Sequence, residues 1–248
     1  MKKSFYLILF FCLVACNSEN APDCFKAEGT IVQTEINVAT FTKILVNVKV
    51  QLFIEEGSEQ KVILETGENI LNDIDAVVTN GTLELTNRLK CNIVRDYGIT
   101  KVYVTSPNIN EIRSSSELPV TSIGVLTYPD LVILSEDAEH EEYYTNGDFE
   151  LELDVENFKI AANGFSNFYI TGEATKAEIG LYAGDSRVEA ADFIVQNLYV
   201  FHRSTNKMIV NPQESIVGEI RGLGNIIAKN QPSLIDVTEY YTGTLIFE

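Results

Sequence analysis

The chain has 248 residues and a formal net charge of −18, from 36 acidic and 18 basic residues. So acidic a protein will not bind nucleic acid or an anionic membrane surface through its charge. A cation, a basic protein surface or a neutral glycan is the more suitable partner.

The N-terminus is typical of an exported lipoprotein. Lys2 and Lys3 precede an apolar run, Phe5 to Val14, that is too short to span a bilayer as a helix. The sequence Leu13-Val14-Ala15-Cys16 resembles a bacterial lipobox, which implies that Cys16 begins the mature protein and carries the lipid. An ordinary signal peptide or an anchor helix with an incidental cysteine is the alternative.

These features predict three segments. We expect a lipoprotein signal peptide over residues 1–15, a lipidated tether over 16–29 and a single domain over 30–248. The partner at the N-terminus is then envelope lipid, held through Cys16. The expected location is the outer membrane, with the domain facing either the periplasm or the cell exterior.

Two cysteines remain in the predicted domain and tether, Cys24 and Cys91. An even pair in an exported protein favours a disulfide. Two unpaired buried thiols are the alternative.

The first third of the domain predicts strands. Apolar and polar residues alternate from Val46 to Ile54, the period of a strand with one buried face. Asn80-Gly81 lies between two apolar runs, which is a strong hairpin signal. Between these features, Glu68 to Ile74 could form a turn or two of helix.

The middle of the chain contains degenerate copies of a later repeat. Ser114-Ser115-Ser116 predicts a corner of small residues, and Asp137 occupies the position where Gly164 stands later. The longer interval between Asp137 and Gly164 requires an insertion. We predict that a hairpin at Asn146-Gly147 supplies it.

Small residues recur with a period near 20 between Phe158 and Asn230. The residues that recur at this interval are Gly164, Gly184, Ser204 and Gly224, and likewise Ser166, Ser186 and Asn206. A fixed period of this size is typical of an array whose units bury their apolar faces against one another. Three short strands and three corners per unit would make one coil of a parallel β-helix, so we predict an all-β solenoid. An antiparallel sandwich explains the period less well.

The repeat also resembles a known family. The run Lys159 to Ser166, echoed at Ile179 to Ser186 and at Ile220 to Ile226, resembles the repeat of the auto-transporter adhesin head domain, or GIN domain. The strand from Val48 to Leu52 resembles the first third of that family, and the resemblance extends from Ile36 to Lys229. It implies a right-handed parallel β-helix with hairpin-rich N-terminal coils, a lipid anchor and an adhesion role. It implies no catalytic residues.

A polysaccharide-active enzyme is the main alternative, because such enzymes can use a β-helix. It would need acids and bases clustered in one cleft. The only histidines are His140 and His202, and four charged residues of the repeat do not stack at matching positions: Asp185, Asp192, Arg187 and Arg221. We therefore expect no catalysis and no cofactor, and a role in binding a glycan or a protein. A purely structural role in the envelope is a third interpretation.

The densest charge in the chain surrounds His140. Its carboxylates are Glu136, Asp137, Glu139, Glu141 and Glu142. Oxygen ligands this close in sequence could hold Ca²⁺, although the order of an EF-hand loop is missing. A solvated loop is the simpler interpretation.

Two further surface features follow from the pattern. Carboxylates alternate with apolar residues from Phe149 to Glu156, which predicts a strand with an acidic outer face.

Tyrosines fall near predicted corners or strand ends, where they could stack on a sugar or a partner protein, or pack against neighbouring side chains of the protein. They are Tyr169, Tyr182, Tyr199, Tyr240 and Tyr241.

Overall fold

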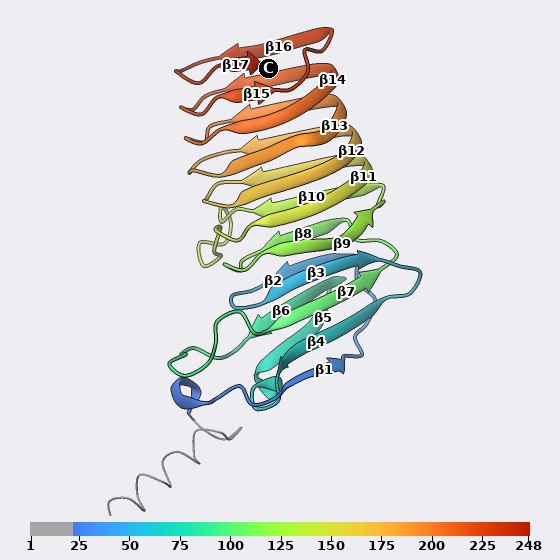
Figure 1. Cartoon of the computed structure of the whole chain (residues 1–248), viewed down its shortest axis with the longest axis vertical. Coiled ribbons are helices and arrows are strands. Elements are labelled where there is room, and N and C mark those ends of the chain that lie inside the picture. Colours follow the sequence, from blue (N-terminus) through green and yellow to red (C-terminus); the bar gives the residue numbers. More distant parts are fainter. Residues whose placement is uncertain (1–21) are drawn as a thin grey trace, which may run out of the picture.

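The computed structural model describes residues 22–248 and shows an all-β protein built from one curled sheet of 17 strands (Figure 1). The described helices are two short 3-10 turns, Asp23–Phe25 and Leu71–Asp73. The predicted signal peptide and Cys16 lie outside the described residues.

The strands fall into a group of short ones, a group of long ones and three that end the stack. The short strands are β1 (Ile31–Glu35), β2 (Lys43–Val46), β3 (Gln51–Glu56), β4 (Lys61–Gly67), β5 (Ile74–Thr79), β6 (Thr82–Asn87), β7 (Lys101–Ser106), β8 (Glu111–Ser114), β9 (Val120–Leu126) and β10 (Asp130–Ser135). The long strands are β11 (Phe149–Ala162), β12 (Asn167–Leu181), β13 (Arg187–His202) and β14 (Met208–Ile220). The last strands are β15 (Ile226–Ala228), β16 (Leu234–Glu239) and β17 (Leu245–Phe247).

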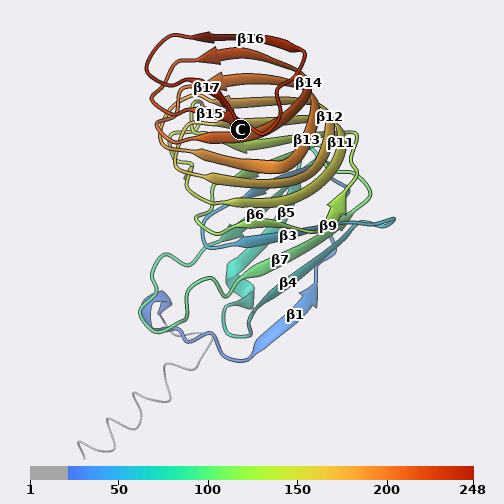
Figure 2. The same cartoon turned by 45° about the horizontal axis from the view of Figure 1, so that its top comes forward.

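The strands stack in two columns that the long strands join. One column runs β5, β6, β2, β8 and β10, and the other runs β1, β4, β7, β3 and β9. Strands β11 to β14 then bend, so that each adds its N-terminal half to the second column and its C-terminal half to the first. Figure 2 shows the resulting curl. The buried apolar side chains of these strands form one core cluster.

The sheet is mixed, not parallel throughout. Every pairing among β2, β3 and strands β8 to β17 is parallel. At the N-terminal end, β1 and β4 pair antiparallel, β4 is antiparallel to β7, and β5 is antiparallel to β6. Of these pairs, only β5 and β6 are joined by a short connection, the Asn80-Gly81 turn, whereas β1 and β4, and β4 and β7, are separated by other strands in the sequence.

The expectation of three short strands per unit is wrong. Each unit from β11 to β14 is one long bent strand followed by a short corner. The pairing resumes beyond the bend with a shifted register, for example between Tyr169 and Gly172 on β12 and between Glu189 and Ile194 on β13. Gly172 has a φ of 101°, a conformation that a side chain would strain, so glycine lets the strand turn without breaking the ladder.

The expected hairpin at Asn146-Gly147 is also wrong. The insertion is present between Asp137 and Gly164, but residues 136–148 form a loop without a strand. Gly147 packs its backbone against the carbonyl oxygen of Ser116, and Thr145 accepts a hydrogen bond from the N–H of Phe165. These contacts hold the segment as a corner between neighbouring units, so its two halves do not pair with each other as the strands of a hairpin.

The hairpin at Asn80-Gly81 is confirmed. Thr79 of β5 pairs with Thr82 of β6, and both turn residues have positive φ, 51° for Asn80 and 79° for Gly81. These are the backbone angles that a tight two-residue hairpin requires.

Candidate functional site

A groove of about 480 Å³ crosses the outer face of the first strand column from β10 to β14. Two rows of side chains border it, because parallel strands in register place equivalent positions side by side about 4.8 Å apart. The first row is Asp130, Asn157, Lys176, Asn197 and Ser215, and the second row is Val132, Lys159, Glu178, Tyr199 and Val217. Between the rows, the floor is formed by positions whose side chains point into the core, such as Phe158 and Leu198.

The polar side chains of the first row are organised by contacts along the stack. The Asn157 amide donates to the Asp130 carboxylate at 2.8 Å, and the Ser215 hydroxyl donates to the amide oxygen of Asn197 at 2.8 Å. Such contacts restrict the rotamers of groups that a ligand would meet, which lowers the entropy cost of binding.

The second row combines an ion pair with an aromatic ring. Lys159 lies 2.7 Å from Glu178, and this hydrogen bond raises the pKa of Lys159 above its usual range. Lys159 therefore stays an ammonium group at neutral pH and is not a proton acceptor. Tyr199 is 44% exposed, which leaves ring surface for a ligand. The groove thus offers hydrogen-bonding groups and one ring, which suits recognition.

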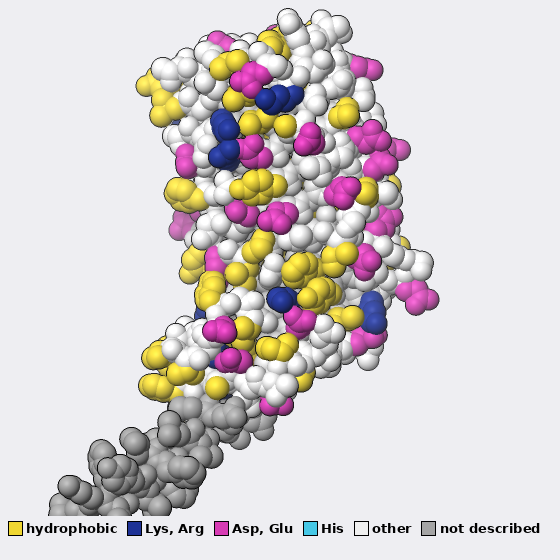
Figure 3. Space-filling model, viewed as in Figure 1, with side chains coloured by type: hydrophobic (Ala, Val, Ile, Leu, Met, Phe, Trp, Pro, Cys, Tyr) yellow, Lys and Arg dark blue, Asp and Glu magenta, His cyan; other side chains and the backbone are white. Residues whose placement is uncertain are grey.

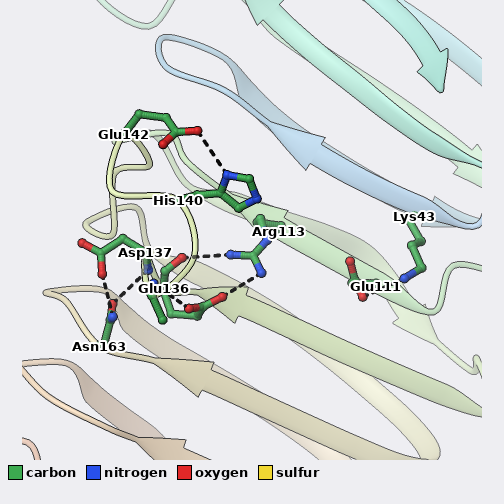
Figure 4. Close-up of polar contacts among 9 residues, drawn as sticks. Lys43, Glu111, Arg113, Glu136, Asp137, His140, Glu142 and Asn163 are labelled. Carbon is green, nitrogen blue, oxygen red and sulfur yellow. Dashed lines mark hydrogen bonds and ion pairs between the residues drawn. The ribbon is translucent and has the colours of Figure 1, made fainter. Parts of the chain in front are cut away.

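The carboxylates of the acidic cluster around His140 contact separate neighbouring residues and do not converge on one point (Figure 4). Glu136 forms an ion pair with Arg113 at 2.7 Å, and Asp137 accepts a hydrogen bond from the Asn163 amide at 2.7 Å. Glu142 contacts His140 at 3.1 Å, while Glu139 and Glu141 are exposed. Among residues 22–248, no three His, Cys, Asp or Glu side chains are arranged to hold a metal ion. The structure therefore gives the predicted Ca²⁺ site no assembled ligands within these residues.

The acidic row lies on the other strand column. Glu150, Glu152, Asp154 and Glu156 of β11 are exposed, while the residues between them point into the core, as predicted. Asp154 pairs with Glu173 of β12, so like charges stand next to each other. Figure 3 shows acidic side chains spread along the length of the stack, with fewer basic ones. These carboxylates keep the outer face hydrated and discourage association.

The tyrosines separate into three environments. Tyr199 lines the groove, and Tyr169 lies beside the acidic row on β12. Tyr182, Tyr240 and Tyr241 lie at the ends of strands of the first column, where the chain leaves the sheet. The sequence interpretation missed the groove's first row, because the interval between successive residues of that row varies between 18 and 27 residues and hides its alignment.

Cys24 and Cys91 are joined by a disulfide in the structure, with Cα atoms 4.6 Å apart. The bond attaches the start of the described chain to the loop after β6. The Arg95 guanidinium reinforces this attachment by donating to the carbonyl oxygens of Asp23, Lys26 and Cys91.

Comparison with known proteins identifies one family model. It is described as "Putative auto-transporter adhesin, head GIN domain" and matches residues 40–232. No curated protein sequence matches the chain. Within residues 22–248, none of the helices has the length and apolar character that crossing a membrane requires.

Several solved structures share the fold. A "putative adhesin" from Bacteroides fragilis has 20% identity and a TM-score of 0.80, and the match covers 90% of this chain and 99% of that one. A "putative lipid binding protein" from Parabacteroides distasonis has 15% identity and a TM-score of 0.63, covering 89% and 97%. A "putative adhesin" from Parabacteroides merdae has 15% identity and a TM-score of 0.57, covering 89% and 97%.

Proposed function

The chain belongs to the head GIN domain family, and on that premise we propose that it is a non-catalytic, lipid-anchored protein of the cell envelope that binds a glycan. In this proposal residues 1–15 are removed, Cys16 carries the lipid, and residues 30–248 are one domain at the outer membrane. The parallel stack of that domain is a right-handed β-helix, which the parallel pairing of β11 to β14 and the family support.

The observation that carries the proposal is the groove across β10 to β14. It lies on the face of the sheet, where backbone groups are already paired, so a peptide could not add to it as an extra strand. Recognition must therefore use side chains. Amides and hydroxyls repeated at the strand spacing, next to an exposed ring, suit a polymer of sugar hydroxyls and apolar ring faces.

A binding role is favoured over catalysis by the state of the groove's ionisable groups. Glycoside cleavage needs a pair of free carboxyl groups across the scissile bond. The carboxylates lining the groove are Asp130 and Glu178, and they are engaged by Asn157 and Lys159. Release of reducing ends from acidic or neutral polysaccharides by the purified protein would contradict the non-catalytic proposal.

The binding proposal is tested by titrating the mature protein with polysaccharides from the native envelope and from host surfaces. We expect Tyr199→Ala and Asn157→Ala to weaken binding by about tenfold each, since each removes one stacking or hydrogen-bonding group. Tyr144→Ala is the matched control, because Tyr144 is 57% exposed but lies on the loop before β11. Equal binding by all variants would contradict the assignment of the groove.

Surface location is tested separately on whole cells. If the domain faces the exterior, as an adhesin must, added protease should degrade it. Full protection from the protease would rule out the adhesion role and leave a periplasmic binding role.

A structural role is tested by pull-down from the native envelope. Recovery of a fixed set of envelope proteins, together with an absence of glycan binding, would support it.

A further inference from the structure

A second pocket, of about 520 Å³, lies at the end of the same outer face, where β13 and β14 end and the chain turns after β16. We call it the arginine–aromatic pocket. Its lining residues are Phe201, Arg203, Glu219, Arg221, Tyr240 and Tyr241. Arg203, Arg221, Tyr240 and Tyr241 are exposed, and the pocket is open to solvent.

The two arginines are neighbours because of the register of β13 and β14. His202 pairs with Ile220, and the N–H of Arg221 donates to the His202 carbonyl at 2.7 Å. The next positions along the strands are therefore Arg203 and Arg221, one above the other. Tyr182 precedes them in this row and Tyr240 follows them, so an aromatic residue flanks the pair on each side.

The two arginines differ in their partners. Arg221 forms an ion pair with Glu219 at 2.5 Å, and its guanidinium lies 4.0 Å from the centre of the Tyr240 ring. Arg203, in contrast, has no ion pair or side-chain hydrogen bond with any residue in 22–248. Arg221 is thus held in place, and Arg203 presents its full set of donors to solvent.

The local charge of the pocket is opposite to that of the whole protein. Two arginines and one glutamate line it, whereas the chain carries a net charge of −18. At physiological ionic strength, charges beyond about 8 Å are largely screened, so a bound group is influenced mainly by the lining residues. A planar guanidinium presents paired donors that match the two oxygens of a carboxylate.

We propose that the arginine–aromatic pocket binds the carboxylate of an acidic sugar, at one end of a glycan that also occupies the groove. This inference rests on the proposed function and specifies its ligand as a uronic-acid-containing oligosaccharide. Tyr199 of the groove and Phe201 of the pocket are two residues apart on β13, so they project from the same face. The two sites form one continuous surface, on which Tyr240 and Tyr241 offer ring faces to the sugar.

The test compares polygalacturonate, dextran sulfate and neutral dextran as probes for the full mature protein, by calorimetry. We expect polygalacturonate to bind most tightly, and Arg203→Gln and Arg221→Gln each to lower its affinity by about tenfold or more. Arg203→Lys should restore only part of the affinity, because an ammonium group lacks the planar fork. Arg88→Gln is the matched control, since Arg88 is exposed and pairs with Asp75 far from the pocket.

The outcomes separate the two proposals. If Tyr199→Ala weakens binding but Arg203→Gln does not, the pocket assignment is overturned and the groove survives. Preferential binding of dextran sulfate would overturn the carboxylate assignment. If none of the probes and no envelope glycan binds, the proposed function itself fails. The Arg203 side chain has no ion pair or hydrogen bond within residues 22–248, so loss of binding in Arg203→Gln cannot be attributed to a lost structural contact.

Discussion

Phe149 on β11 and Phe168 on β12 stack in the core with ring centroids 5.1 Å apart and ring planes 10° from parallel. Both side chains are fully buried. Their contact joins consecutive units of the stack, because Phe149 pairs directly with Phe168 in the parallel ladder. Val120 and Val188 continue this core row on either side of the two rings, so apolar side chains of successive units cover one another along the stack.

The replacement Phe168→Ala should lower the free energy of unfolding by about 3–5 kcal/mol, because it removes a buried ring and leaves a cavity between two units. Urea unfolding followed by circular dichroism measures this. Phe165→Ala is the control, since Phe165 is 66% exposed and its loss should cost less than about 0.5 kcal/mol. Similar losses in both variants would contradict the account of the core.

A comparison of Gly172 with Gly124 distinguishes two effects that destabilise the protein when a side chain is added: a strained backbone angle and a steric clash. Both have positive φ, 101° and 73°, but a methyl group at Gly172 would collide with the Leu153 carbonyl, whereas Gly124 has open space. We expect Gly172→Ala to destabilise the protein by about 2 kcal/mol more than Gly124→Ala. Equal losses in urea unfolding would show that the backbone angle alone matters.

His202 should make stability depend on pH. Burial lowers its pKa from the ordinary 6.5 to about 4. The unfolded chain therefore holds the proton more tightly, and the stability that neutral His202 contributes is complete above about pH 6.5 and lost as the pH falls toward 4. The expected loss is about 3 kcal/mol.

The control for this prediction is His202→Leu, since the neighbouring residues in the same core row are Leu181 and Ile220. Unfolding free energies of the two proteins should diverge between pH 6.5 and 4, with the leucine variant less sensitive. Parallel profiles would assign the acid sensitivity to the surface carboxylates instead.

The disulfide between Cys24 and Cys91 encloses a loop with a sequence separation of 67. Its removal by Cys24→Ala with Cys91→Ala should cost about 4 kcal/mol in the chain-entropy model. Thiol counting on the unfolded, oxidised chain from residue 22 onward checks the bond directly. Two free thiols would sink the prediction.

Lipidation is tested with the two cysteines of the N-terminal segment. Cys16→Ser should abolish incorporation of labelled fatty acid in cells and release the protein from the membrane fraction. Cys12→Ser should do neither, because Cys12 lies within the predicted signal peptide. Label retained by the Cys16 variant would rule out the lipobox interpretation.

Much of the fold could be predicted because it depends on short-range pattern. The recurrence of small residues at Gly164 and Gly184 indicated stacked units, and Asn80-Gly81 indicated a hairpin that the backbone angles confirm. The alternation along Phe149 to Glu156 indicated which side chains are buried. The predicted internal form of the unit was wrong, because the bend lies within one long strand and is made by a shift of register instead of a corner that divides the strand.

The candidate sites required the tertiary structure. Arg203 and Arg221 are 18 residues apart in the sequence, so aligning the units at a fixed interval of 20 does not place them at equivalent positions. The observed pairing of His202 with Ile220 makes the two arginines neighbours. The sequence by itself determined an acidic, all-β chain of repeated units. The three-dimensional register decided which outward side chains share a surface, because bulges and corners change the interval from one unit to the next.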